Sequence, residues 1–237
     1  MVDKMKAGLA VICGVGAIAT AGVAVSHNVP LRVTRADARA VKQLSKGTLA
    51  TVPNPWPSFT EQVAIILAVQ DAVLKAAPTN KGIPTGHSRE LGDLLRLRYG
   101  LCYDRSRAIE TVLRYRGFEV RHVAIYRTVE AASPLIALIS PGTESHAVTE
   151  VHTLRGWMLV DSNSRWVGLT TKGDPISISE LRRSKNVSWH VVNKGPPAPI
   201  FQEPFTWMYG LYSRHGHFFR PYDVVPDVNW SELSQNL

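Results

Sequence analysis

Cysteine is scarce in this chain of 237 residues, and its placement constrains the fold. One of the two cysteines, Cys13, lies in an apolar N-terminal run, and the other, Cys102, stands at the start of a helical pattern in Gly100-Leu101-Cys102-Tyr103-Asp104. Cys102 therefore lacks an internal disulfide partner. A fold without such cross-links is stabilised by a hydrophobic core. A chain of this length that is 45% hydrophobic can build one core, or one core with a small appendage.

The chain is basic, with a formal net charge of +8 and a pI of about 9.7. Nucleic-acid binding is the first function class that such a charge suggests. The lysines and arginines are scattered, however, and no nucleic-acid motif accompanies them. A basic surface that faces an anionic membrane or an acidic polymer fits this pattern better. We therefore expect no nucleic-acid partner.

Residues 7–25 contain no charged side chain, and Lys4 and Lys6 precede them. This pattern is typical of an export signal, and Ala19-Thr20-Ala21 offers small residues for a signal peptidase. The run is also long enough to span a bilayer, so a membrane anchor stays open as the alternative. Residues 1–25 are thus predicted to be a signal peptide or membrane anchor. The rest of the chain is predicted to be periplasmic or extracellular, with an inner-membrane anchor in the second case.

The predicted export supports a functional role for Cys102. Exported proteins usually pair their cysteines, because an unpaired thiol is open to oxidation outside the cytoplasm. A single thiol retained there indicates a functional role.

The remaining chain divides into two parts. Residues 26–57 are basic and rich in proline, which predicts a linker or stalk, although 28–50 can also form a helix that packs late in folding. Residues 58–237 contain no repeat or linker and predict one α+β domain. We expect helices at 59–77, about 88–98, 102–116 and near 177–181, with strands at 120–126, 145–153, 157–163 and 187–192.

Cys102 lies where a helix should begin. The positive end of the helix dipole and unpaired backbone N–H groups lower the pKa of a thiol at that position. The backbone N–H of Cys102 or Tyr103 can also stabilise an oxyanion. If Cys102 were only a core residue, it should instead lie on the apolar stripe of Ile109 and Val112.

Two later strands supply candidate partners. If the loop between them has two or four residues, His146 and Asp161 lie on the same face of the hairpin; a loop of three or five residues separates them. In the first case the imidazole can reach the carboxylate, and the helix of Cys102 can pack across that face. His146 would then take the thiol proton, and Asp161 would orient the imidazole. We expect Glu150 to pair with an arginine rather than to act as an acid.

The other histidines offer weaker signals. His215-Gly216-His217 is the best metal-like pair, but it lacks a third ligand at a recognisable spacing. We therefore predict no metal and no cofactor. The further candidates for the base are His122, His152, His190, His215 and His217.

Several motifs together resemble the transglutaminase-like superfamily. They are Gly100-x-Cys102-x-Asp104, the strand from Arg121, His146-Ala147-x-x-Glu150-Val151 and Trp157-x-x-Val160-Asp161. The resemblance covers roughly residues 90–165. It implies a papain-like α+β core, with the cysteine at a helix N-terminus packed on an antiparallel sheet, as in bacterial exported cysteine peptidases and amidases. It assigns Cys102 as nucleophile, His146 as base and Asp161 as third member.

The leading hypothesis is an exported, thiol-dependent hydrolase or acyltransferase that acts on an amide or ester in the cell envelope. Peptide, peptidoglycan and glycan-linked substrates all remain open. The alternative is a non-catalytic binding or assembly module in the envelope. Tyr103, Trp157 and Trp166 are candidate substrate contacts. The aromatic segment 201–222 either forms a wall of the cleft or wraps the core.

Overall fold

The computed structural model describes residues 27–45, 58–84, 87–129, 133, 136–137, 140, 142–184, 186–189, 198–212 and 227–237. The predicted signal or anchor lies outside these residues, and so do Cys13, His190, His215 and His217. Within the described part of the chain, no helix is long and apolar enough to cross a bilayer.

A four-stranded antiparallel sheet forms the centre of the fold. Its strand order is β3-β2-β1-β6, so β6, which comes late in the chain, pairs with the first strand, β1. The sequence predicted the first three strands but assigned no strand to the aromatic segment that holds β6. The four strands are β1 (Val120–Arg127), β2 (Ser145–Thr153), β3 (Gly156–Val160) and β6 (Phe205–Tyr209).

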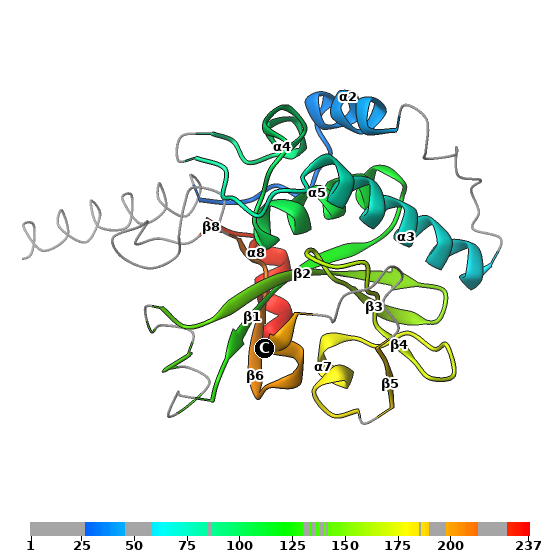
Figure 1. Cartoon of the computed structure of the whole chain (residues 1–237), viewed down its shortest axis with the longest axis vertical. Coiled ribbons are helices and arrows are strands. Elements are labelled where there is room, and N and C mark those ends of the chain that lie inside the picture. Colours follow the sequence, from blue (N-terminus) through cyan, green and yellow to red (C-terminus); the bar gives the residue numbers. More distant parts are fainter. Residues whose placement is uncertain are drawn as a thin grey trace, which may run out of the picture.

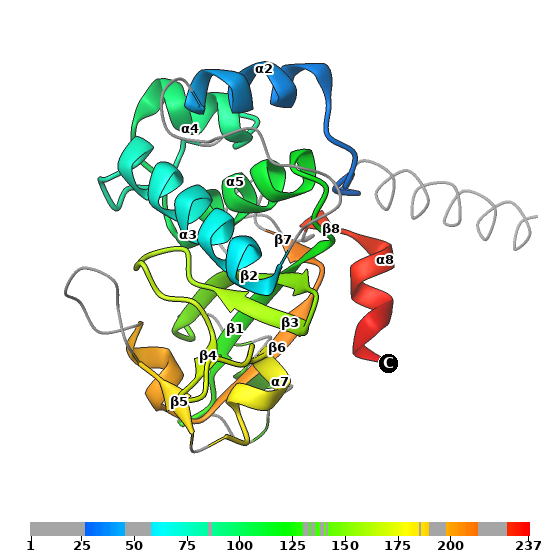
Figure 2. The same cartoon turned by 90° about the vertical axis from the view of Figure 1, so that its right-hand side faces the viewer.

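Helices cover one face of the sheet, as Figures 1 and 2 show from two sides. Ser58 caps the longest helix by accepting a hydrogen bond from the N–H of Glu61, as its capping sequence predicts. Gly117 ends the helix that begins at Cys102, with a φ of +85°, a conformation that favours glycine. These helices are α3 (Phe59–Ala76), α4 (Leu91–Leu97) and α5 (Cys102–Tyr115).

One further helix, α2 (Arg35–Leu44), lies inside the stretch that was predicted as a linker or stalk. Thr34 and Asp37 form a capping box at its start. Its Val41 is fully buried in the core that α3, α4 and α5 share. For residues 35–44 the structure therefore has the packed helix, not the stalk.

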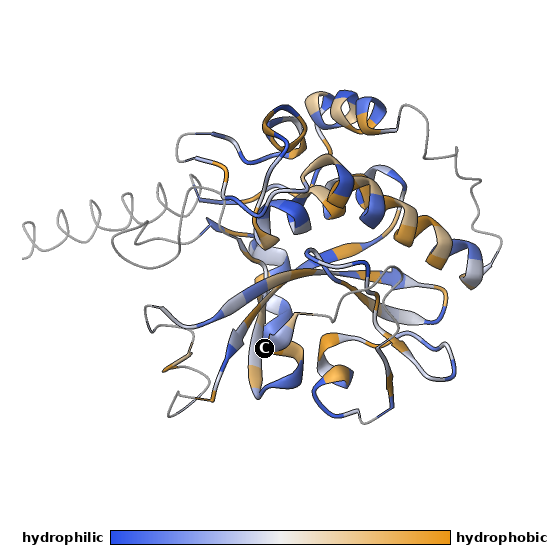
Figure 3. Ribbon diagram, in the orientation of Figure 1, coloured by the Kyte–Doolittle hydropathy of each residue, from blue (hydrophilic) through white to orange (hydrophobic). Residues whose placement is uncertain are grey.

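The two faces of the sheet carry separate cores. Val151, Met158 and Val160 point toward the helices and join a cluster with Ile109 and Val112 of α5. The neighbouring residues of each strand point the other way, because side chains alternate along a strand. Figure 3 shows apolar and polar stretches along both the helices and the strands.

The face that α5 covers differs from the expectation. The sequence allowed the helix of Cys102 to pack across the face that carries His146 and Asp161. The body of α5 instead packs on the opposite face, where Ser106 Oγ lies 3.1 Å from Thr149 Oγ1. Only the first turn of the helix reaches the edge where His146 lies.

The second face is covered by short elements and loops (Figure 2). Val123, Val148 and Leu159 pack there against Trp166, and Phe201 belongs to the same cluster. The predicted strand at 187–192 is a strand at Val187–Ser188; residues 190–192 lie outside the described residues. The covering elements are β4 (Leu169–Thr170), α7 (Ile178–Leu181), β5 (Val187–Ser188) and η1 (Pro199–Gln202).

The last segment returns to the start of the described chain. The N–H of Val29 donates to the carbonyl of Val228 at 2.9 Å. The side chain of Asn229 donates to the carbonyl of Val29 at 2.8 Å. The elements involved are β7 (Leu211–Tyr212), β8 (Asp227–Val228), α8 (Trp230–Leu233) and η2 (Ser234–Asn236).

Candidate active site

Helix α5 begins at Cys102, and a hydrogen bond from the preceding backbone helps to fix that start. Asp104, in the first turn, accepts a hydrogen bond from the N–H of Leu101 at 2.9 Å. A Cβ on Gly100 would lie 3.1 Å from the Cβ of Asp104, so the chain approaches the helix closely there. Cys102 is a free, partly exposed thiol at the first helical residue. This is the position that the sequence predicted.

Asp104→Ala is expected to lower the free energy of unfolding by about 1–3 kcal/mol, because the N–H of Leu101 loses its acceptor in a largely buried place. Asp104→Asn keeps an acceptor oxygen and should cost clearly less. Urea unfolding of the two variants measures the difference. Equal losses would mean that the acceptor at the helix start is not what Asp104 contributes.

His146 and Asp161 meet because the turn between their strands has two residues, Leu154 and Arg155. The register pairs Thr149 with Val160, which places His146 and Asp161 on the same face by alternation. His146 Nε2 lies 2.6 Å from Asp161 Oδ1, and both side chains are buried. The parity argument from the sequence is therefore confirmed.

The sulfur of Cys102 completes the arrangement. It interacts with the side chain of His146 and with the backbone N–H groups of Ala147 and Tyr103. Burial alone would raise the pKa of the thiol. The bond to His146, the charge of that imidazole and the two N–H groups outweigh burial, and the pKa of Cys102 falls below its usual value.

The pKa of His146 shifts upward, opposite to that of Cys102. Burial would lower the pKa of its imidazole, but the Asp161 carboxylate and the sulfur of Cys102 together raise the pKa to about 10. The pKa of Asp161 falls below its usual range, because the charge of His146 outweighs burial. Thiolate, imidazolium and carboxylate thus stabilise one another.

The loop after β3 holds the carboxylate in place. Asp161 leaves the β2 ladder, and its N–H donates to the carbonyl of Trp166 at 3.0 Å, which explains why the predicted strand 157–163 ends at Val160. Ser164 Oγ donates a short hydrogen bond to Asp161 Oδ2. Arg105, one turn after Cys102, donates to Asn163 Oδ1 at 2.8 Å. Helix α5 therefore carries Cys102 at its start and contacts the carboxylate loop one turn later.

Aromatic rings pack around the imidazole. Phe201 meets the ring of His146 edge-on at 5.7 Å between centroids, and Trp166 lies 5.1 Å from Phe201. Phe201 belongs to the aromatic segment, so that segment does contact the site. Trp166 is fully buried, which does not fit the expectation that its ring contacts a substrate.

The two other candidate substrate contacts occupy different places. Tyr103 is partly buried beside Cys102, and the guanidinium of Arg89 lies over its ring. Trp157 covers the guanidinium of Arg121 at 4.0 Å from the ring centroid. Arg121 also pairs with Glu150 at 2.6 Å, so Glu150 has the arginine partner that the sequence predicted.

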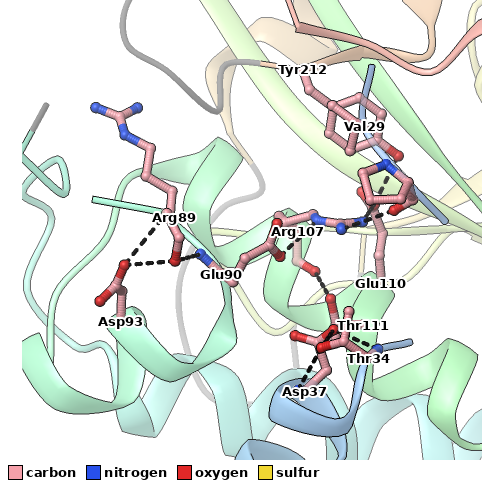
Figure 4. Close-up of polar contacts among 12 residues, drawn as sticks. Val29, Thr34, Asp37, Arg89, Glu90, Asp93, Arg107, Glu110, Thr111 and Tyr212 are labelled. Atoms are coloured by element: carbon pink, nitrogen blue, oxygen red, sulfur yellow. Dashed lines mark hydrogen bonds and ion pairs between the residues drawn. The ribbon is translucent and has the colours of Figure 1, made fainter. Parts of the chain in front are cut away.

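A second polar cluster lies farther along α5, and sequence reasoning missed it. His122 Nδ1 is 2.6 Å from Glu110 Oε1, and the imidazole stacks on Tyr212. Tyr212 Oη donates to Glu110 and Glu232, at 3.1 and 2.8 Å. Figure 4 shows Arg107 of α5 between Glu90 and Glu110. Glu110 and His122 are separated by only 12 residues, but Tyr212 and Glu232 come from the C-terminal segment.

Among the residues that the structure describes, no group of three or more histidine, cysteine, aspartate or glutamate side chains is placed to hold a metal ion. His152, another candidate base, is exposed and packs against Trp157. The arrangement of Cys102, His146 and Asp161 instead suits nucleophilic attack by sulfur with proton transfer through imidazole.

Comparison with known proteins gives one family match. Residues 58–162 match the model of the transglutaminase-like superfamily. The matched residues hold α3, the helix of Cys102, His146 and Asp161, so the resemblance inferred from the motifs is confirmed for this part of the chain. A comparison with curated proteins finds no match.

Two solved structures are similar to the chain. One is a candidate cysteine protease from Cytophaga hutchinsonii, with 15% identity, a TM-score of 0.40 and 76% of this chain covered. The other is a candidate protease from Parabacteroides distasonis, with 14% identity, a TM-score of 0.38 and 65% covered. The match spans 61% of the length of the first structure and 30% of the second.

Proposed function

We propose that the protein is a thiol-dependent hydrolase or acyltransferase that acts on an amide or ester bond in the cell envelope. Cys102 is the nucleophile, His146 the general base and acid, and Asp161 the residue that orients His146. The observation that carries the proposal is the contact of the sulfur with the imidazole together with the hydrogen bond from imidazole to carboxylate, with 2.6 Å between His146 Nε2 and Asp161 Oδ1.

The first half-reaction forms an acyl-enzyme. The thiolate of Cys102 attacks the carbonyl carbon, a C–S bond forms, and the π electrons move to oxygen. When the tetrahedral intermediate collapses, the bond to the leaving amine or alcohol breaks, and His146 gives that group its proton. The backbone N–H of Cys102 or Tyr103 is the predicted donor to the oxyanion.

The second half-reaction releases the acyl group. His146, now neutral, takes a proton from water or from an amine, which attacks the thioester carbon. The C–S bond breaks, and the thiolate returns beside the imidazolium. Water yields hydrolysis, and an amine yields transfer, so the same side chains serve both outcomes.

The shifts in pKa predict the pH dependence. The rate should rise with pH as the thiol of Cys102 ionises, below the pH expected for an ordinary thiol. It should fall again near pH 10, where His146 loses the proton that the leaving group requires. Acylation by p-nitrophenyl acetate, whose phenolate leaves without a proton, measures the rising limb. Acylation by a p-nitroanilide, whose amine must be protonated to leave, measures both limbs.

Mass spectrometry tests the covalent step. The wild-type protein should carry an acetyl group on the peptide that contains Cys102, and Cys102→Ser should carry little or none. Adding a small amine then separates the two outcomes, because faster loss of the acetyl group indicates transfer. If neither ester nor iodoacetamide modifies Cys102 faster than a free thiol, the enzyme proposal fails and the non-catalytic module takes its place.

A further inference from the structure

Gln70, in the second half of helix α3, is fully buried and bonded to the carboxylate loop. Its Nε2 donates to the carbonyl of Asp161 at 2.8 Å and to the carbonyl of Trp166 at 2.7 Å. These two residues are the first and last of the loop that follows β3. One side-chain amide thus connects both ends of the loop to a helix.

Chemistry fixes the orientation of this amide. Both neighbours are carbonyl oxygens, which only accept hydrogen bonds, so the nitrogen must face them. The amide oxygen, Gln70 Oε1, is buried without a hydrogen-bond partner in the described structure. An unpaired buried acceptor is unfavourable. The two bonds from Nε2 are therefore the contribution that a glutamine makes here.

The loop that Gln70 holds determines where the Asp161 carboxylate lies. The N–H of Asp161 and the side chain of Gln70 both donate to the carbonyl of Trp166. Without Gln70 that carbonyl and the carbonyl of Asp161 lose a buried donor, and the loop must move to find another. A move of the main chain at Asp161 displaces the oxygen that accepts from His146.

We propose that Gln70 is a positioning residue of the candidate site, which sets the Asp161 carboxylate beside His146 through the main chain of the loop at 161–166. It touches neither the sulfur nor a substrate, and acts through Asp161. The inference rests on the proposed function of Cys102. It adds α3 to the elements that control the nucleophile.

The same helix provides a matched control. Gln62, eight residues earlier, is also buried, and its Oε1 accepts from the N–H of Leu154 at 2.7 Å. Eight residues are close to two helical turns, so both glutamines lie on one side of α3. Gln62 holds the turn at one end of β3, and Gln70 holds the loop at the other end.

The test compares Gln70→Met with Gln62→Met, because methionine keeps the length of glutamine and removes its hydrogen bonds. Alkylation of Cys102 by iodoacetamide is followed by peptide mass spectrometry over pH, with the melting temperature as a measure of folding. We expect Gln70→Met to move the midpoint of the alkylation curve up by about one pH unit, since a displaced Asp161 supports the imidazolium less. Gln62→Met should lower the melting temperature and leave the midpoint unchanged.

Each outcome has a separate meaning. An unchanged midpoint in folded Gln70→Met overturns the positioning role and leaves the proposed function intact. A wild-type curve like that of a free thiol overturns the proposed function, and the positioning role with it. If Gln70→Met does not fold, Gln70→Glu takes its place, because the neutral acid keeps the shape of glutamine with one donor instead of two. An unchanged alkylation curve in Gln70→Glu also overturns the inference.

Discussion

His146→Ala is expected to slow acylation of Cys102 by p-nitrophenyl acetate by about 10²- to 10⁴-fold near neutral pH, the range typical of a lost general base. Two effects combine. The thiol loses the hydrogen bond and the charge that lower its pKa, so burial then raises the pKa. The acyl transfer step also loses its proton carrier. The rate of nitrophenol release, measured over pH, should then rise only at the higher pH at which the unassisted thiol ionises.

His152→Ala is the control for that variant. His152 lies on the same strand, six residues farther along, with its side chain half exposed. Its replacement should leave the acylation rate within about twofold of wild type, because a surface substitution of this kind changes little. If the two variants lose activity equally, His146 is not the base, and the chain of hydrogen bonds through Asp161 has another role.

Glu110→Gln should have the largest effect on stability, lowering the free energy of unfolding by about 3–5 kcal/mol, as when one partner of a buried ion pair is removed. Glu110 is fully buried among His122, Arg107 and Arg114. Burial would raise the pKa of this carboxyl, but His122 and the two arginines lower it to about 2. Urea unfolding at neutral pH measures the loss.

The pH dependence of stability gives a second check on Glu110. A carboxyl whose pKa is about 2 in the folded protein and near 4.5 when unfolded stabilises fully above pH 4.5. That contribution is lost as the pH falls toward 2, and Glu110→Gln should flatten this part of the curve. Glu119→Gln is the control, because Glu119 is mostly exposed in its pair with His152 and should change stability by less than about 0.5 kcal/mol.

Local signals in the sequence predicted much of the fold and the site. The capping residues of α3 and the glycine after α5 are short-range features, and each placed its element within a few residues. The length of the turn between β2 and β3 decides whether His146 and Asp161 share a face, and the sequence left that length open. The motif around Cys102, together with the expected helix start, indicated a candidate nucleophile.

Features that depend on distant contacts could not be predicted in this way. The face that α5 covers is decided by which strand residues bury most surface, and alternation alone leaves both faces open. Gln70 lies in a helical pattern with no local sign that its amide meets a loop 91 and 96 residues away. The cluster of Glu110 needs Tyr212 and Glu232, whose partners become apparent only once β6 pairs with β1.

The contacts of Glu232 with α5 and β7 affect the order in which the protein folds during synthesis. During synthesis, α5 leaves the ribosome long before Glu232 does, so Arg114 and Tyr212 must wait for that carboxylate, to which both donate. Contacts between residues so far apart form late, since a long loop must close first. The nascent chain therefore acquires its thiol early but forms these contacts to α5 only after Glu232 has been made, so a product truncated before Glu232 should keep Cys102 and lack the contacts.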